Sequence, residues 1–162
     1  MNQVTIPQEI EALAATTVDA ALAVHRAIGP GLLESAYQEC LAIELSCRGL
    51  KVERERVLPL VYRGHAIENA YRLDLIVEGR LLLELKAVEA IQPIHRVQVT
   101  TYLKLLKLPL GLLINFNVPL IKDGISRILN LDFRGSAAPT ATGAHTDQPL
   151  SLSTLAPSRL RA

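Results

Sequence analysis

Apolar residues recur along this chain with two different periods, and the change of period separates helical segments from strand-like ones. From Ile6 to Ile28 they recur every three or four positions, which predicts an amphipathic helix. Gly29-Pro30-Gly31 ends this helix, and a second helix is predicted from Leu32 to Arg48, with Gly49 as its C-cap. Both helices precede the strand-like part of the chain.

Three strand-like segments follow, at about residues 51–62, 70–78 and 80–87. Turn residues separate them, with Arg63-Gly64-His65 in the first gap and Glu78-Gly79-Arg80 in the second. Connections this short predict a meander of three neighbouring strands.

The next segment returns to the helical period. Pro93 opens a strongly apolar helix that reaches about Lys107, Pro109 breaks it, and residues 110–116 indicate a buried strand. Residues 119–131 fit neither period and stay unassigned. The resulting order is αβββαβ after an extra N-terminal helix, which predicts an α/β fold with a mixed four-stranded sheet flanked by helices.

The 162 residues are expected to form one domain, residues 1–134, followed by a tail, residues 135–162. The tail consists largely of small and polar residues, contains three prolines and has no hydrophobic period. This composition predicts a disordered segment.

Composition narrows the possible functions. Lysine and arginine number 17 against 16 acidic residues, which argues against binding nucleic acid by bulk charge and leaves a local basic groove open. Two phenylalanines, four tyrosines and no tryptophan offer few stacking platforms for single strands.

A cytoplasmic location without membrane contact is expected. No apolar run approaches the ~18–20 residues that span a membrane, and the N-terminus lacks a signal-peptide pattern. Cys40 and Cys47 lie in a helical stretch, too far apart along its axis to bond to each other, and are expected to be small core fillers in a reducing compartment.

Three charged residues interrupt runs that otherwise predict buried strands. Asp74 lies between two leucines, and Glu84 and Lys86 flank Leu85 after three leucines. Charges are rarely buried unless they are paired or hold a metal. Because side chains alternate along a strand, Glu84 and Lys86 share a face. Asp74 joins them if the connection holds an odd number of residues, such as the loop 78–80, or if a bulge intervenes.

That register would bring two carboxylates and an ammonium together, a geometry that can hold a divalent cation and a water. Two simpler interpretations stay open. A solvated strand face often carries an E-x-K ion pair, but the flanking residues are too apolar for a solvated edge. A buried ion pair of purely structural use would leave Asp74 without a partner.

Further polar residues lie at helical spacing. Glu34 and Tyr37 share a face of the second helix; an exposed glutamate favoured by the helix dipole, beside a packing tyrosine, is the simpler interpretation. His95, Gln98 and Tyr102 form a polar stripe on an otherwise apolar helix, although each could instead satisfy a buried backbone group.

Arg72 lies two residues from Asp74 and is expected on the same face. It could contact phosphate, or it could pair with Asp74 when no metal is bound.

These patterns resemble the PD-(D/E)XK nuclease superfamily, with its restriction-endonuclease-like αβββαβ core, an Asp on the second strand and E-x-K on the third. More narrowly, they resemble the GxxExxY proteins over roughly residues 8–131. The motifs that carry the resemblance are Gly31-Leu-Leu-Glu34-Ser-Ala-Tyr37, Tyr71-Arg-Leu-Asp74, Glu84-Leu-Lys86, Pro93-Ile-His95, Gln98-Val-Thr-Thr-Tyr102 and Leu113-Ile-Asn-Phe-Asn-Val-Pro.

The resemblance implies metal-dependent phosphodiester hydrolysis. Asp74 and Glu84 would hold Mg²⁺ or Mn²⁺ with the Leu85 backbone carbonyl, and Glu34 would reach the ion directly or through water. Lys86 would orient or deprotonate the attacking water, its pKa lowered by the nearby cation. Gln98 and Tyr102 match a spacing that flanks the scissile phosphate in the RecB-like exonuclease branch. Weaker candidates for substrate contact are Tyr37, Arg72 and His95.

Three classes of function stay open at this point. The first, which the filled core positions favour, is a Mg²⁺- or Mn²⁺-dependent nuclease acting on nucleic acid. The second is a non-catalytic module that binds nucleic acid or a nucleotide on a nuclease fold. The third is a small interaction protein whose apolar first helix docks a partner or a second copy, as in a homodimer.

Overall fold

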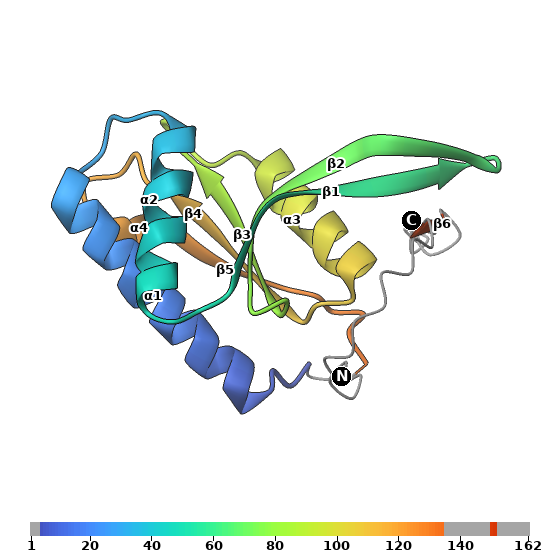
Figure 1. The fold of residues 1–162 in the computed structure, drawn as a ribbon, viewed down its shortest axis with the longest axis horizontal. Coiled ribbons are helices and arrows are strands. Elements are labelled where there is room, and N and C mark those ends of the chain that lie inside the picture. The colour runs from blue at the N-terminus through green and yellow to red at the C-terminus, as the bar shows by residue number, and fades with distance from the viewer. Residues whose placement is uncertain (1–3, 135–149, 152–162) are drawn as a thin grey trace, which may run out of the picture.

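The computed structural model describes residues 4–134 and 150–151. Ten elements are present in this part of the chain (Figure 1). They are α1 (Gln8–Ile28), α2 (Glu34–Cys47), β1 (Val52–Tyr62), β2 (His65–Val77), β3 (Leu81–Lys86), α3 (Pro93–Leu106), β4 (Leu110–Asn115), α4 (Ile121–Gly124), β5 (Ile125–Leu129) and β6 (Leu150–Ser151).

The strands form one mixed sheet in the order β5-β4-β3-β2-β1-β6. Neighbours β1 and β2, β2 and β3, and β4 and β5 run antiparallel, whereas β3 and β4 are parallel and joined through α3. The predicted mixed four-stranded sheet is therefore confirmed as β1 to β4. The sequence did not predict β5 and β6, which extend the sheet at its two edges.

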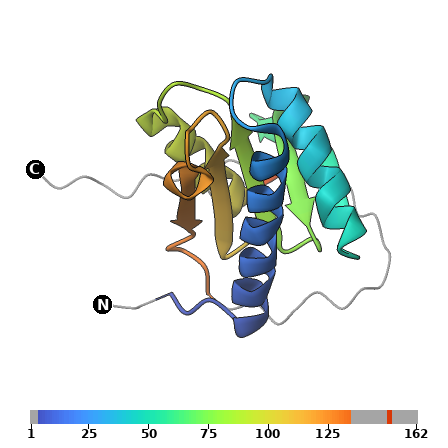
Figure 2. The same ribbon diagram turned by 90° about the vertical axis from the view of Figure 1, so that its left-hand side faces the viewer.

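Helices cover both faces of the sheet, as Figures 1 and 2 show. On one face, α1 and α2 pack against alternate apolar residues of the central strands, such as Leu83 and Leu85. On the other face, α3 packs against Ile76 and Leu82. We name these two groups the α1–α2 cluster and the α3 cluster. The near-continuous leucine runs of the sequence are explained by burial on both faces.

The β1–β2 hairpin is longer than the sequence pattern predicts. Strand β2 begins at His65 rather than near residue 70, and a two-residue turn, Arg63–Gly64, joins the strands. Both turn residues have positive φ, 48° and 79°, as a tight antiparallel hairpin requires. Residues 65–69 escaped prediction because their strand structure depends on pairing with β1 and not on apolar alternation.

The unassigned residues 119–131 form the short helix α4 and the edge strand β5. Gly124 ends α4, and a Cβ atom there would collide with the Asn115 carbonyl oxygen, so this close approach requires glycine. The spacing of apolar residues along the chain does not reveal such a contact between two segments.

The predicted tail lies largely outside the described residues. Its one described part, Leu150–Ser151, pairs in parallel with Leu60 and Val61 of β1. Both cysteines carry free thiols; Cys40 is half-buried beside the α1–α2 cluster, but Cys47 is exposed near the end of α2 and is not the core filler expected. Within the described ranges, no helix is long and apolar enough to cross a membrane.

Candidate active site

The turn between β2 and β3 determines which charged side chains meet. Val77 pairs with Leu81, Ile76 with Leu82 and Leu75 with Leu83 across the three residues 78–80. Asp74 and Glu84 are the next residues along each strand beyond the last of these pairs. The connection thus holds the odd number of residues that same-face placement requires.

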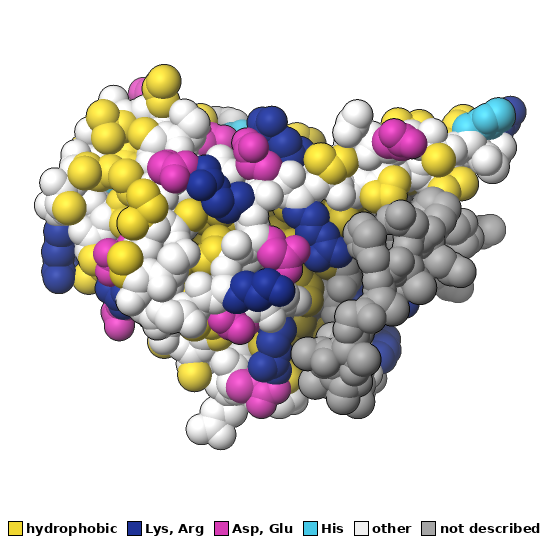
Figure 3. All heavy atoms as spheres, in the orientation of Figure 1, with side chains coloured by type: hydrophobic (Ala, Val, Ile, Leu, Met, Phe, Trp, Pro, Cys, Tyr) yellow, Lys and Arg dark blue, Asp and Glu magenta, His cyan; other side chains and the backbone are white. Residues whose placement is uncertain are grey.

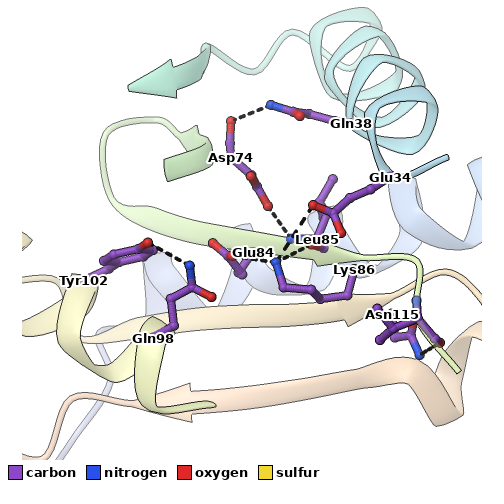
Figure 4. A network of polar contacts seen from close by, with 10 residues as sticks. Glu34, Gln38, Asp74, Glu84, Leu85, Lys86, Gln98, Tyr102 and Asn115 are labelled. Atoms are coloured by element: carbon purple, nitrogen blue, oxygen red, sulfur yellow. Dashed lines mark hydrogen bonds and ion pairs between the residues drawn. The ribbon is translucent and has the colours of Figure 1, made fainter. Parts of the chain in front are cut away.

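Hydrogen bonds draw Asp74, Glu84 and Lys86 together at this point (Figure 4). Asp74 Oδ2 accepts a hydrogen bond of 2.7 Å from the backbone N–H of Leu85. Lys86 Nζ donates to Glu84 Oε1 at 2.7 Å and to the Leu85 carbonyl oxygen at 2.9 Å. Glu34, the first residue of α2, brings its Oε1 to 3.9 Å from the same Nζ. An ammonium therefore lies among the oxygens of three residues.

Glu84 is the most constrained of these groups. The residue is 2% exposed, and its Oε2 has no hydrogen-bond partner among the described residues. Burial, and next the charge of Asp74, raise the pKa of Glu84 to about 7 despite its bond to Lys86. Burial also raises the pKa of Asp74. The site thus holds more buried carboxylate than its single lysine satisfies.

The ammonium of Lys86 responds to this excess of negative charge. Burial acts to lower the pKa of Lys86, but the hydrogen bond and charge of Glu84, followed by the charges of Glu34 and Asp74, outweigh it and raise the pKa. This direction is opposite to the one expected beside a bound cation, because here carboxylates surround the lysine. Lys86 is accordingly protonated at neutral pH.

The donor set fits a hard divalent cation. Asp74, Glu84 and the Leu85 carbonyl offer only oxygen ligands, and the unpartnered Glu84 Oε2 marks a place where a positive charge would be stabilised. Among the described residues, no group of three or more His, Cys, Asp or Glu side chains lies together as a ready metal site. The fit therefore depends on two carboxylates and a carbonyl. Glu34 contacts the site through Lys86, with its Oε1 3.9 Å from Nζ.

The α3 face contributes Gln98 and Tyr102. Gln98 Nε2 donates to the Tyr102 hydroxyl oxygen at 2.8 Å. Burial raises the pKa of Tyr102, and the charges of Glu84 and Asp74 add to this effect. The structure therefore brings the predicted pair beside the carboxylates (Figure 4) and leaves the hydroxyl proton of Tyr102 available for donation.

Tyr37 has a different role from the substrate contact expected of it. The side chain is fully buried and stacks on Phe116 with ring centroids 4.5 Å apart. Its hydroxyl donates to the Gly29 carbonyl at 2.7 Å and accepts from the Leu32 N–H at 3.1 Å. Tyr37 thereby fixes the loop that leads into Glu34 and is not open to a substrate.

His95 and Arg72 also contact other groups than the sequence predicted. The His95 ring accepts a hydrogen bond from the Gln92 N–H at 3.1 Å and so caps the start of α3. Leu73 packs in the α3 cluster and Leu75 in the α1–α2 cluster, so strand alternation breaks at Asp74. Arg72, 70% exposed, lies 3.8 Å from Glu55 instead of pairing with Asp74.

Two residues that support the site escaped the sequence analysis. Gln38 Nε2 donates to the Asp74 carbonyl oxygen at 3.1 Å, and its position four residues after Glu34 on a helix was the available signal. Asn115 is buried at the end of β4, where its side chain binds both the N–H and the carbonyl of Val88. As a polar residue inside an apolar run, Asn115 carried the same signal as Asp74.

Comparison with known proteins agrees with this geometry. No curated protein and no solved structure matches the chain. The family model of the PD-(D/E)XK nuclease superfamily matches residues 11–128, which spans α1 to β5 and includes every residue of the site. The narrower GxxExxY assignment stays a prediction. The chain belongs to the PD-(D/E)XK nuclease superfamily.

Proposed function

We propose that this protein is a nuclease that hydrolyses phosphodiester bonds of nucleic acid with Mg²⁺ or Mn²⁺. The observation that carries the proposal is the convergence of Asp74, Glu84 and Lys86 beside an unpartnered, buried carboxylate oxygen. A structural ion pair would leave one carboxylate uncompensated, and such a buried charge costs several kcal/mol. A cation bound at the site would compensate this charge, and the relief of the cost would contribute to the affinity for the cation.

The residues divide into ligands and groups that act on the substrate. Asp74, Glu84 and the Leu85 carbonyl would hold the cation, with Glu34 next in reach. A bound Mg²⁺ or Mn²⁺ supplies a Lewis acid for the phosphoryl oxygen and lowers the pKa of a bound water.

Lys86 would act through its positive charge. Because its pKa is raised, the Lys86 amine stays protonated and is poorly suited to act as a general base. The protonated Nζ is suited to stabilise the charge that develops on the phosphate and the leaving oxygen. Tyr102, whose oxygen already accepts a hydrogen bond from Gln98, would donate a hydrogen bond to a non-bridging phosphate oxygen and position the substrate.

A cleavage assay with labelled DNA and RNA, in Mn²⁺ and in EDTA, tests the proposal. The wild type is expected to cleave at least one substrate only with Mn²⁺. Lys86→Ala should lower turnover about 10²-fold or more and barely change substrate affinity, because one lysine is a minor part of a phosphate-contacting surface. Lys122→Ala, at an exposed position on α4, is the matched control and should cleave like the wild type.

A non-catalytic binding module is the second candidate. Two contacts favour it: Lys86 Nζ already donates to Glu84 Oε1 and to the Leu85 carbonyl oxygen, two of the oxygens that a cation would need. If the wild type binds a substrate but cleaves none of a panel of single-stranded, duplex, flapped and RNA substrates, this function replaces the first.

A further inference from the structure

Residues 59–70 of the β1–β2 hairpin project from the domain as a two-stranded arm (Figure 1). No residue of this arm is buried. Within the described part of the chain, β6 is the sole strand along its edges, and it pairs at two positions. Because an isolated hairpin is marginally stable in water, an arm with only these two paired positions among the described residues points to contact with another molecule.

The root of the arm is fixed beside the site. Leu58 is buried in the α3 cluster, and the Tyr71 ring packs edge-on against Tyr102, with ring centroids 5.7 Å apart. Tyr102 faces the carboxylates, and Asp74 follows three residues after Tyr71 in the same strand. The direction of the arm is therefore linked to the position of the site.

The tip of the arm carries the chemistry of a nucleic-acid contact. The Arg63 guanidinium lies 5.6 Å from the ring centroid of Tyr62, which is 50% exposed, and His65 pairs with Tyr62 across the hairpin. Figure 3 shows a basic side chain and a histidine at this free end, beyond hydrophobic side chains. A stacked arginine and an exposed ring together suit phosphate and base contacts.

Arg63 differs from the arginines at the root. There, Arg54 pairs with Glu39 and Arg72 with Glu55. Among the described residues, Arg63 forms no ion pair, so its charge is available to a phosphate. The whole chain is nearly neutral, so its net charge does not reveal this local positive charge at the end of the arm.

The dimensions of the arm select the kind of nucleic acid. Asp74 follows His65 by nine positions in β2, which at ~3.3 Å per residue places the tip roughly 30 Å from the carboxylates. This is about nine base pairs of B-form DNA, or close to one helical turn. The major groove of B-form DNA admits a two-stranded ribbon, whereas that of A-form RNA is too narrow for side chains to read.

We infer that the arm is a binding element for duplex DNA, with its tip in the major groove about one helical turn from the phosphate at Asp74 and Glu84. The exposed Ile67 would contact thymine methyl groups, and Glu68 can accept from a cytosine amino group. The inference rests on the proposed nuclease function and adds its substrate class.

Fluorescence anisotropy in EDTA tests the arm without cleavage. The probes are DNA duplexes of about 24 and about 6 base pairs, where only the longer one spans the estimated reach, and an RNA duplex of the longer length. Tyr62→Ala combined with Arg63→Asn removes the tip, and asparagine tolerates the positive φ of the turn. Lys122→Ala is the control. It removes one positive charge from α4, whose Ile121 packs in the α1–α2 cluster, whereas Leu58 at the root of the arm packs in the α3 cluster on the other face of the sheet.

The tip variant should lose about ten-fold in affinity for the long DNA duplex, the scale of one stacking contact and one phosphate contact. Its affinity for the short duplex and for RNA should match the wild type, and Lys122→Ala should change each affinity less than about two-fold. Unchanged affinity for long DNA, or an equal loss for all three probes, overturns the inference.

Two further outcomes separate this inference from others. If sedimentation shows that the tip variant alters self-association while DNA affinity stays unchanged, the arm joins copies of this chain and the inference fails. Cleavage by the wild type with normal binding by the tip variant would reject the arm alone. Length-dependent DNA binding without any cleavage would keep the arm and reject the proposed nuclease.

Discussion

Strand β2 runs through two regions of opposite character. From Leu73 to Val77 it is packed on both faces and holds Asp74 in a network of hydrogen bonds. From His65 to Asn69 every residue is exposed. One strand thus carries a rigid, desolvated end, where charges are costly, and a solvated end, where they are not.

The difference shows how one sheet can serve two tasks. Burial raises the pKa of Glu84 and leaves a carboxylate oxygen unpartnered, which prepares the inner end to bind a cation. Exposure leaves Arg63 and Tyr62 at the outer end open to a partner. Strand β2 runs without interruption from one end to the other.

The largest expected contrast concerns stability. Leu82→Ala, at a fully buried position in the α3 cluster, should lower the free energy of unfolding by about 2–5 kcal/mol because it leaves a cavity. Leu60→Ala, the same substitution in the arm, should cost less than about 1 kcal/mol. Urea denaturation measures both, and equal losses would show that the arm is packed as firmly as the core.

The pH dependence of stability isolates the buried end. The folded pKa of Glu84, about 7, lies above its unfolded value of roughly 4.3. The folded state therefore binds the extra proton, and the stability it contributes, complete below about pH 4, is lost as pH rises toward 7. At about 1.4 kcal/mol per pKa unit, the loss should amount to roughly 3–4 kcal/mol.

Glu84→Gln should remove this part of the pH dependence. Glu68→Gln, on the exposed arm, is the matched control and should keep it. Denaturation curves between pH 4 and 8 provide the measurement. A wild type whose stability rises over this range by a similar amount would contradict the raised pKa of Glu84.

A smaller effect is expected where α3 meets the substrate. Tyr102→Phe removes the hydroxyl that accepts from Gln98 and should lower kcat/KM about ten-fold, the scale of one lost hydrogen bond to a charged group. Gln98→Ala should have a similar effect. Tyr71→Phe, in the ring that packs against Tyr102, is the control and should keep wild-type kinetics. Equal losses at both tyrosines would show that the effect is not specific to the Tyr102 hydroxyl.

The smallest effect concerns the tail. Truncation after Arg134 should leave the melting temperature unchanged within about 2 °C, because a tail of the disordered kind that the sequence predicts would contribute no cooperative unfolding enthalpy. The pairing of β6 with Leu60 and Val61 reaches only the exposed arm. Differential scanning calorimetry decides the matter, and a much larger drop would show that residues beyond 134 belong to the domain.

The sequence predicted the buried end of β2 better than the exposed end. Apolar runs broken by Asp74 and Glu84 carry a strong signal, because burial restricts which residues can stand there. The arm carries a weak one: His65 to Asn69 forms strand by pairing alone. Residues with support roles, such as Tyr37, could not be told from substrate contacts, since the spacing of a motif does not reveal where a hydroxyl finds its partners.

Isothermal titration with Mn²⁺ tests the central claim most directly, namely that the carboxylates form a cation site in which Lys86 competes for the ligands. Asp74→Ala should weaken Mn²⁺ binding strongly, because it removes a ligand. Lys86→Ala should preserve or tighten it, because it removes a like charge 2.7 Å from Glu84. An equal loss of affinity in both variants, or no Mn²⁺ binding by the wild type, would contradict the account.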